Sequence, residues 1–260
     1  MKKLIVNLSL IVIAIFALSF NAQAVPLLQL DAISADGTQA TYNPHPDVED
    51  VEIQPGEFTL YALLSGDPDV GTGKYDPAMV DGSWTFYVSL AITPKLDQSF
   101  SDPLGSIEFG LAGGTLDTID VVDGMDWGIP PVDIMGQPDE LEKHGIFETY
   151  YYQYAFTFSS LNVVNQYNVQ DDPGGFGTAD PTNGSKSLYY AAFDVNTSGL
   201  LGDGDYQVHF DLYDLENNKA PYSHDLTTVP EPATFLLLVT GLGGLAIFRR
   251  RGSNSDLIAG

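Results

Sequence analysis

Aspartates in a glycine-rich segment are the first residues whose types and spacing could do chemistry. Asp67, Asp69 and Asp76 belong to the sequence GDPDVGTGKYD, where alternating acids could surround a calcium ion that takes six to eight oxygen ligands. Pro68 interrupts this loop and no glutamate closes it, so the match to an EF-type calcium loop is incomplete. Calcium is therefore the one cofactor that the sequence suggests, and a solvated acidic turn is the competing interpretation.

Pairs of carboxylates could also perform the acid–base chemistry that cleaves glycosidic bonds. Asp211 with Asp214, or Glu140 with Glu142, are candidate pairs. Such a pair must face each other across a cleft, about 5 to 9.5 Å apart, and sequence spacing does not provide this geometry. Because the chain between residues 25 and 230 holds 33 acids, some pairs of this kind arise by chance.

The histidines and serines lack a recognisable catalytic or metal-binding spacing. No histidine lies in a pattern such as H-E-x-x-H, and no serine lies in a G-x-S-x-G turn. His209 alternates with apolar neighbours, which predicts an outward position at the surface or edge of a strand. The chain has no cysteine, which excludes disulfides, zinc–thiolate sites and thiol catalysis. We therefore predict that the protein is not an enzyme.

Aromatic side chains could stack on sugar rings where they point away from a core. The segment Ile146–Ser159 alternates so that Tyr150 and Tyr152 share one face while Tyr151 lies on the other. If the even-numbered tyrosines form the core, Tyr151 points outward, and it joins Trp84 as a candidate sugar-stacking residue. The competing interpretation is an ordinary strand composition, in which these rings serve packing alone.

Apolar and polar residues alternate with a period of two along most of residues 25–220, as is typical of half-buried strands. The clearest case is Trp84–Thr93, where every second residue is large and apolar. Turns rich in glycine and aspartate separate such segments. The pattern predicts an all-β exported domain over residues 25–220, an antiparallel two-sheet sandwich of jelly-roll-like form. The expected strands are residues 27–33, 38–42, 58–64, 84–93, 104–111, 115–121, 146–159, 186–195 and 205–215.

The connections between these strands are expected to be irregular. Residues 45–52 and 162–185 are predicted to be loops, and residues 221–232 a linker. The turn Ala35–Gly37 predicts that the strands on either side of it form a hairpin.

The N-terminus has the organisation of a secretory signal peptide. A positively charged start precedes the apolar stretch Leu4–Phe20, and Ala22 and Ala24 form an A-x-A cleavage site. We therefore expect signal peptidase to remove residues 1–24 from the exported protein.

The C-terminus ends in an apolar stretch followed by a basic cluster. Residues 233–248 carry no charge and would form a transmembrane helix of about 24 Å, short but usable against a bilayer core of about 30 Å. Arg249, Arg250 and Arg251 follow directly, so the positive-inside rule predicts that residues 249–260 form a basic cytoplasmic tail. The chain would then cross the inner membrane once, with the β domain outside.

This tail begins with Val229, Pro230, Glu231 and Pro232, and in its three-part order it resembles a PEP-CTERM sorting signal. The resemblance implies that an exosortase, a membrane protease, recognises this tail, cleaves it near Pro230, Glu231 and Pro232, and transfers or releases the protein at the cell surface. It also implies a host that makes exopolysaccharide, which is then a candidate partner. A permanently anchored single-pass ectodomain is the competing interpretation, because residues 252–260 continue beyond the arginines.

Short segments of the domain resemble a second group of surface proteins. Leu28–Asp31, Phe58–Tyr61 and Gly204–Tyr213 are similar to early and late strands of the choice-of-anchor domains. That resemblance implies a β-rich ectodomain and carries no biochemical activity.

The exported part of the chain is strongly acidic. Residues 25–230 contain five lysines, no arginine and 33 acids. Such a charge repels phosphate backbones and excludes nucleic acid as a partner. The sequence as a whole therefore predicts a non-catalytic cell-surface or matrix protein associated with exopolysaccharide and biofilm. A carbohydrate- or calcium-binding surface module is the alternative.

Overall fold

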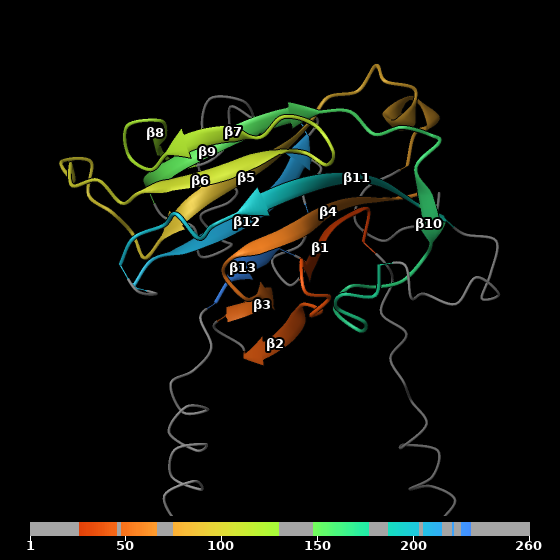
Figure 1. Cartoon of the computed structure of the whole chain (residues 1–260). Helices are drawn as coiled ribbons and strands as arrows, with labels where there is room; N and C mark the ends of the chain where they lie inside the picture. Colours follow the sequence, from red (N-terminus) through yellow and green to blue (C-terminus); the bar gives the residue numbers. More distant parts are fainter. Residues whose placement is uncertain are drawn as a thin grey trace, which may run out of the picture.

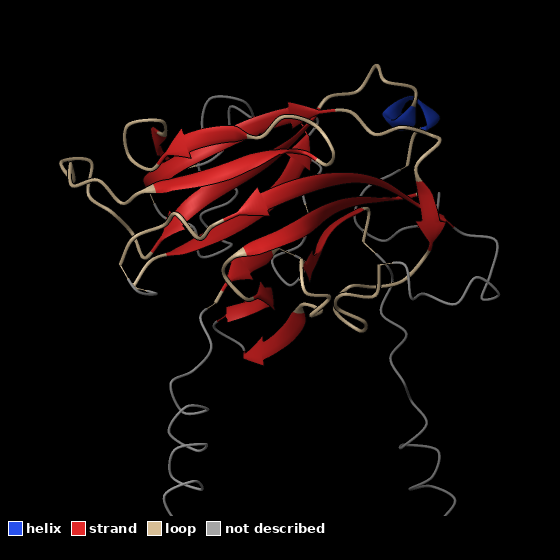
Figure 2. Cartoon of the chain, in the orientation of Figure 1, coloured by secondary structure: helices blue, strands red, loops and turns tan. Residues whose placement is uncertain are grey.

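The computed structural model describes residues 26–45, 48–66, 75–129, 148–176, 187–202, 205–214, 220 and 225–229. In this part of the chain the protein consists of thirteen strands and one turn of 3₁₀ helix, η1 (Pro77–Val80) (Figure 2). The prediction of an all-β protein with almost no helix is confirmed.

The strands form two sheets, here called sheet A and sheet B (Figure 1). All neighbouring strands are antiparallel except β3 and β13, which run parallel. Sheet A has the order β1 (Leu28–Ser34), β4 (Glu57–Ser65), β11 (Ser187–Asn196), β6 (Ser106–Leu111) and β7 (Asp117–Asp120), with β10 (Val163–Asn165) paired to β11. Sheet B has the order β2 (Thr41–His45), β3 (Val48–Ile53), β13 (Leu226–Thr228), β12 (Gln207–Asp214), β5 (Phe86–Thr93), β9 (Thr149–Phe156) and β8 (Asp126–Gly128).

The inward side chains of both sheets meet in one apolar core. On β12 every second residue, Val208, Phe210 and Leu212, is fully buried in this core. Phe210 contacts Phe58 of β4 edge to face, with ring centroids 5.9 Å apart. Because Phe58 lies in sheet A and Phe210 in sheet B, the two sheets pack face to face, as the alternating pattern predicts.

The hairpin predicted around Ala35–Gly37 is confirmed only at its turn. The Ser34 N–H donates to the Thr38 carbonyl and a single antiparallel bridge joins Ile33 to Gln39, after which β2 continues into sheet B. β1 pairs instead with β4 along its whole length, from Leu28 opposite Leu64 to Ser34 opposite Phe58. This register places the apolar residues of both strands on the core side, which the short hairpin would not achieve.

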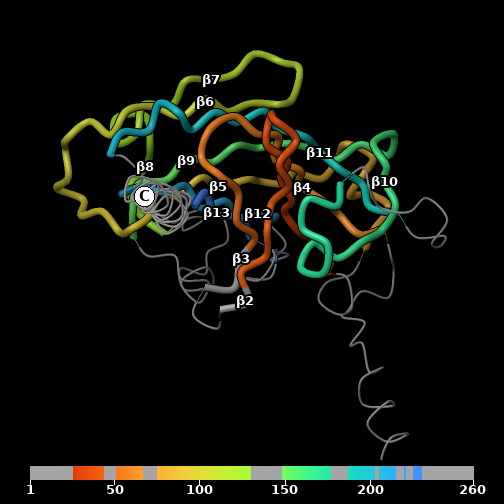
Figure 3. The backbone as a smooth tube through the Cα atoms, turned by 60° about the horizontal axis from the view of Figure 1, so that its bottom comes forward, coloured from red at the N-terminus to blue at the C-terminus, as the bar shows by residue number. Residues whose placement is uncertain are grey.

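Three segments expected to be irregular contain strands, one of which is β10 in the loop predicted over residues 162–185. Residues 48–53 form β3 although their sequence, VEDVEI, is rich in acids, because Val51 and Ile53 are buried while Glu52 is only half-buried. Residues 226–228, expected in the linker, form β13 between β12 and β3 (Figure 3). The backbone N–H of Val229 then donates to the carbonyl of Ile53 at 2.8 Å. The folded domain therefore extends to Val229.

A loop over residues 166–176 covers the outer face of sheet A and is bound by polar side chains of β1. Gln29 pairs with this loop as a strand would, since its amide donates to the Tyr167 carbonyl and accepts from the Val169 N–H, both at 3.0 Å. Phe176 stacks on Tyr61 of β4, with ring centroids 3.6 Å apart. The irregular segment predicted from residue 162 onward is thus tied to the sheet at several points.

Asp31 lies at the centre of this attachment. Its carboxylate accepts hydrogen bonds from the Tyr167 hydroxyl at 2.6 Å and the Gly174 N–H at 2.6 Å. Gly174 has a φ of +69°, a conformation that favours glycine. Burial raises the pKa of Asp31 to about 6, against the lowering effect of these hydrogen bonds.

Within the described ranges, we find no helix that is long and apolar enough to cross a membrane. The predicted signal peptide, residues 1–24, lies outside the described residues, as do the predicted transmembrane helix, residues 233–248, and the predicted cytoplasmic tail, residues 249–260.

Candidate functional site

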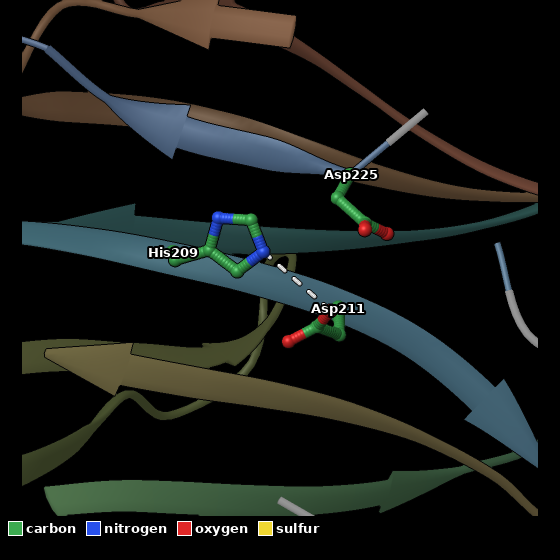
Figure 4. A group of neighbouring side chains, drawn as sticks. All are labelled: His209, Asp211 and Asp225. Carbon is green, nitrogen blue, oxygen red and sulfur yellow. Dashed lines mark ion pairs between the residues drawn. The ribbon is translucent and has the colours of Figure 1, made fainter. Parts of the chain in front are cut away.

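Three ionisable side chains converge on the outer face of sheet B (Figure 4). His209 and Asp211 are two residues apart on β12, so both point away from the core. Asp225 directly precedes β13, the neighbouring strand, and its carboxylate turns toward the other two side chains. We call these three residues the His–Asp–Asp cluster.

The His–Asp–Asp cluster is buried although it lies outside the main core. The exposed fractions of His209, Asp211 and Asp225 are 6%, 1% and 1%. The predicted surface position of His209 is therefore wrong, although its outward direction is as expected. Alternation along a strand shows which face a residue occupies, but it does not show what covers that face.

The imidazole of His209 lies between a hydroxyl and two carboxylates. Its Nδ1 is 2.7 Å from the hydroxyl oxygen of Thr227, on β13. Its Nε2 lies 3.5 Å from Oδ1 of Asp211, which is too long for a good hydrogen bond. One nitrogen or oxygen from each member of the cluster lies within 4.8 Å of the others.

Asp211 is held in place by one of its two oxygens. Its Oδ2 accepts a hydrogen bond of 3.2 Å from the Ser89 hydroxyl on β5. Its Oδ1, which faces His209, has no hydrogen-bond partner among the described residues. Tyr213, also on this face, stacks on Tyr87, and burial together with the charge of Asp211 raises the pKa of Tyr213.

This arrangement suits cation binding or proton exchange better than glycoside cleavage. Asp211 and Asp214, the carboxylate pair considered for hydrolysis, alternate to opposite faces of β12 and do not converge. Asp214 accepts a 2.9 Å hydrogen bond from the indole N–H of Trp84. Glu140 and Glu142 lie outside the described residues.

The two candidate sugar-stacking residues do not offer open faces. Trp84 is half-buried, packs against the core and uses its only polar group to bond Asp214. Tyr151 lies on the face opposite Tyr150, as its alternation predicts, but only 5% of it is exposed. It packs with Ala91 and Ile129, so the stacking role predicted for it finds no support in this structure.

The calcium loop predicted at residues 67–76 can be followed only at its end. Asp67 and Asp69 lie outside the described residues. Asp76 caps the N-terminus of η1, where its carboxylate accepts a 2.9 Å hydrogen bond from the Ala78 N–H. This is the ordinary role of aspartate at a helix start.

An open hollow of about 310 Å³ lies on the outer face of sheet A, and the sequence did not single it out. Glu57, Glu108 and Asp194 give its lining an acidic character. Tyr61 lies two residues beyond Thr59, which lines the hollow, and its ring contacts Tyr190 and Phe176. Strands β4, β6 and β11 bring these residues together, and no local sequence pattern predicts the hollow that they form.

The residues that carry the sorting hypothesis lie at and beyond the end of the described chain. Val229 is half-buried beside β3. Pro230, Glu231, Pro232 and the arginines Arg249, Arg250 and Arg251 lie outside the described residues, as do Ala22 and Ala24 of the signal-peptidase site.

Comparison with known proteins bears on this C-terminal segment. No curated protein and no solved structure matches the chain. Residues 228–251 match the family described as the PEP-CTERM protein-sorting motif. The match begins on the last residue of β13 and ends on the last of the three arginines. The chain therefore carries a PEP-CTERM protein-sorting motif, which supports an exported protein that an exosortase sorts.

Proposed function

We propose that the chain is a non-catalytic cell-surface or matrix protein, exported through its signal peptide and sorted through its C-terminal tail. The motif over residues 228–251 is the observation that carries this proposal. In this view Pro230, Glu231 and Pro232 form the site that an exosortase recognises. Residues 233–248 place that site at the outer face of the inner membrane, and the arginines stop transfer.

The position of the motif against the fold supports this division of roles. β13 pairs with both β12 and β3, so the chain remains in the sheet up to Val229. The proline-flanked Glu231 follows two residues later, where Pro230 and Pro232 oppose continued strand pairing. The sorting site would thus be an accessible segment at the boundary of a rigid domain.

Association with exopolysaccharide or biofilm is the destination we propose for the sorted protein. The strongly acidic exported part, with five lysines against 33 acids, favours solubility outside the cell and attraction to cations that cross-link acidic polymers. The β domain would act there as a structural component. The chain itself would catalyse no reaction, and its tail would be the substrate of the sorting protease.

Replacement of Arg249, Arg250 and Arg251 by glutamate tests the sorting proposal. The triple variant should lose its cytoplasmic flank and no longer reach the cell surface, because negative residues do not retain the end of the span inside. A lysine triple variant, which keeps the charge, is the matched control and should be delivered. Normal surface delivery of the glutamate variant would contradict the proposal.

A second candidate function is a carbohydrate-binding module, favoured by the acidic hollow and by the rings of Tyr61, Tyr190 and Phe176, which lie further along the same face of sheet A. Rings beside carboxylates can stack on a sugar and accept hydrogen bonds from its hydroxyls. Retention on an insoluble polysaccharide that weakens in Tyr190→Ala would support this role. Equal retention of the variant and the parent would exclude it.

A further inference from the structure

We propose that the His–Asp–Asp cluster binds a divalent cation of the zinc type, and that this cation fastens the C-terminal strand to the β domain. The site consists of Nε2 of His209 and one carboxylate oxygen each from Asp211 and Asp225. It is independent of the sorting tail and of any sugar-binding role.

The donor atoms point to zinc rather than calcium. One imidazole nitrogen with two carboxylate oxygens is a ligand set that zinc and similar first-row metals accept. Calcium prefers six to eight oxygen ligands and does not favour an imidazole nitrogen. Three protein ligands leave a fourth position of a tetrahedral zinc for water or another group.

The spacing of the donors fits such a metal. Ligands at about 2.0–2.2 Å from a tetrahedral zinc are about 3.3–3.6 Å from one another. The distance of 3.5 Å between Nε2 of His209 and Oδ1 of Asp211 lies in this range, whereas it is long for a direct hydrogen bond. The remaining donor distances, all within 4.8 Å, need only small side-chain rotations to close on an ion.

The hydroxyl of Thr227 can accept a hydrogen bond from the tautomer of His209 that a metal requires. A neutral histidine that donates Nδ1–H to this hydroxyl, 2.7 Å away, leaves a lone pair on Nε2, on the side of the carboxylates. Metal-binding histidines are commonly fixed by a hydrogen bond from their second nitrogen in this way. The Ser89 hydroxyl supports Asp211 in the same manner, through the oxygen that does not face the imidazole.

The burial of Asp211 provides a second, independent indication. Its side chain is 1% exposed, and its Oδ1 has no hydrogen-bond partner within the described ranges. A buried carboxylate oxygen without a donor is unfavourable unless a cation compensates it. A divalent cation bound at Oδ1 would supply this compensation for Asp211.

Such a cation would join segments that are distant in sequence. His209 and Asp211 belong to β12, whereas Asp225 leads into β13, which has only three residues. Metal ligands on both strands would stabilise their pairing at the place where the chain leaves the domain for the sorting motif. The cluster would then hold the exit strand in the sheet.

Zinc binding by the full-length, untagged chain tests the site directly. The protein is purified in detergent, stripped with a chelator and titrated with Zn²⁺ by calorimetry, and with Co²⁺ as a spectroscopic probe. We expect one tight equivalent per chain, visible Co²⁺ absorption bands typical of four-coordinate geometry, and a higher Tm with zinc than without it.

Isosteric variants assign the binding to the cluster. Asp211→Asn and His209→Gln should each weaken the tight equivalent at least tenfold and abolish both the Co²⁺ bands and the zinc-dependent rise in Tm. Asp36→Asn removes an exposed acid from a turn and should leave all three readouts unchanged. Circular dichroism checks that each variant is folded, and Asp225→Asn replaces any cluster variant that is not.

Two results would overturn the proposal. Tight binding with equal affinity in the parent chain and in the folded cluster variants would place the zinc elsewhere on the acidic surface. A folded parent chain that binds no zinc tightly would show that the cluster serves packing alone.

Discussion

At the scale of single residues, Asp31 makes stability depend on pH in an unusual direction. Its pKa in the folded protein is raised to about 6 by burial, from an ordinary value of 3.8. Between these values the folded protein holds the proton more firmly than the unfolded chain. The contribution of Asp31 to the free energy of unfolding is therefore greatest below about pH 4, falls as the pH rises to about 6 and is constant above it.

Asp31→Asn should remove this pH dependence and lower stability at neutral pH. The amide has one acceptor oxygen where the carboxylate has two, so it satisfies fewer of the donors from Tyr167, Gly174 and Phe176. Leaving such groups unsatisfied costs about 1–3 kcal/mol. Urea unfolding at pH 4, 5, 6 and 7 measures both effects. A variant curve that still declines in parallel with that of the parent would show that Asp31 is not the titrating group.

The two tryptophans provide a matched pair of substitutions. Trp84 donates its indole N–H to Asp214, whereas the indole N–H of Trp127 is buried and has no hydrogen-bond partner within the described ranges. Trp84→Phe should lower the free energy of unfolding by about 1–3 kcal/mol, because it leaves the carboxylate without this charge-assisted bond. Trp127→Phe removes an unsatisfied donor and should cost less, as measured by denaturant unfolding. Equal losses would contradict a specific role for the Trp84 hydrogen bond.

The sequence identified some of these residues for reasons that differ from their roles. Trp84 and Tyr151 stand out as aromatic, but partners distant in sequence bury them. His209 and Asp211 have the two-residue spacing that places side chains on one face of a strand, which could have suggested a site. Asp225 completes the cluster only because β13 pairs beside β12, and no local pattern shows that pairing.

At the scale of elements, β12 connects the apolar core with the His–Asp–Asp cluster. It pairs with β5 and β13, presents Phe210 to the core and carries His209 and Asp211 on its other face. Phe210→Ala should destabilise the domain by about 3–5 kcal/mol, because it removes a fully buried ring that joins the two sheets. Leu111→Ala, at a position 45% exposed on β6, is the control and should cost far less. Thermal unfolding compares the two, and similar losses would mean that the core is not continuous across the sheets.

Strong alternation made some elements predictable, and its absence hid others. β4, β5, β6, β9, β11 and β12 were all expected close to their observed bounds. β3 was hidden because three of its six residues are acids, and β8, β10 and β13 because three residues are too few to show a period. The predicted hairpin was too long because a turn signal was favoured over the pairing of β1 with β4, which lies further along the chain.

At the scale of the whole molecule, the chain combines a β domain with a sorting motif that starts where the last described strand ends. This arrangement gives the parts of the sequence distinct tasks. In the function that we propose, the domain would supply an acidic surface outside the cell, and the motif would determine where that surface is delivered.

The mass of the mature C-terminus tests the central claim most directly. The protein is recovered from the surface and medium of its native cells, and its C-terminal peptide is identified by mass spectrometry. Sorting by an exosortase predicts an end close to Pro230, Glu231 and Pro232, with Arg249–Arg251 and everything beyond them absent. A membrane-bound protein that still ends in Gly260 would contradict the account and identify the chain as a permanently anchored ectodomain.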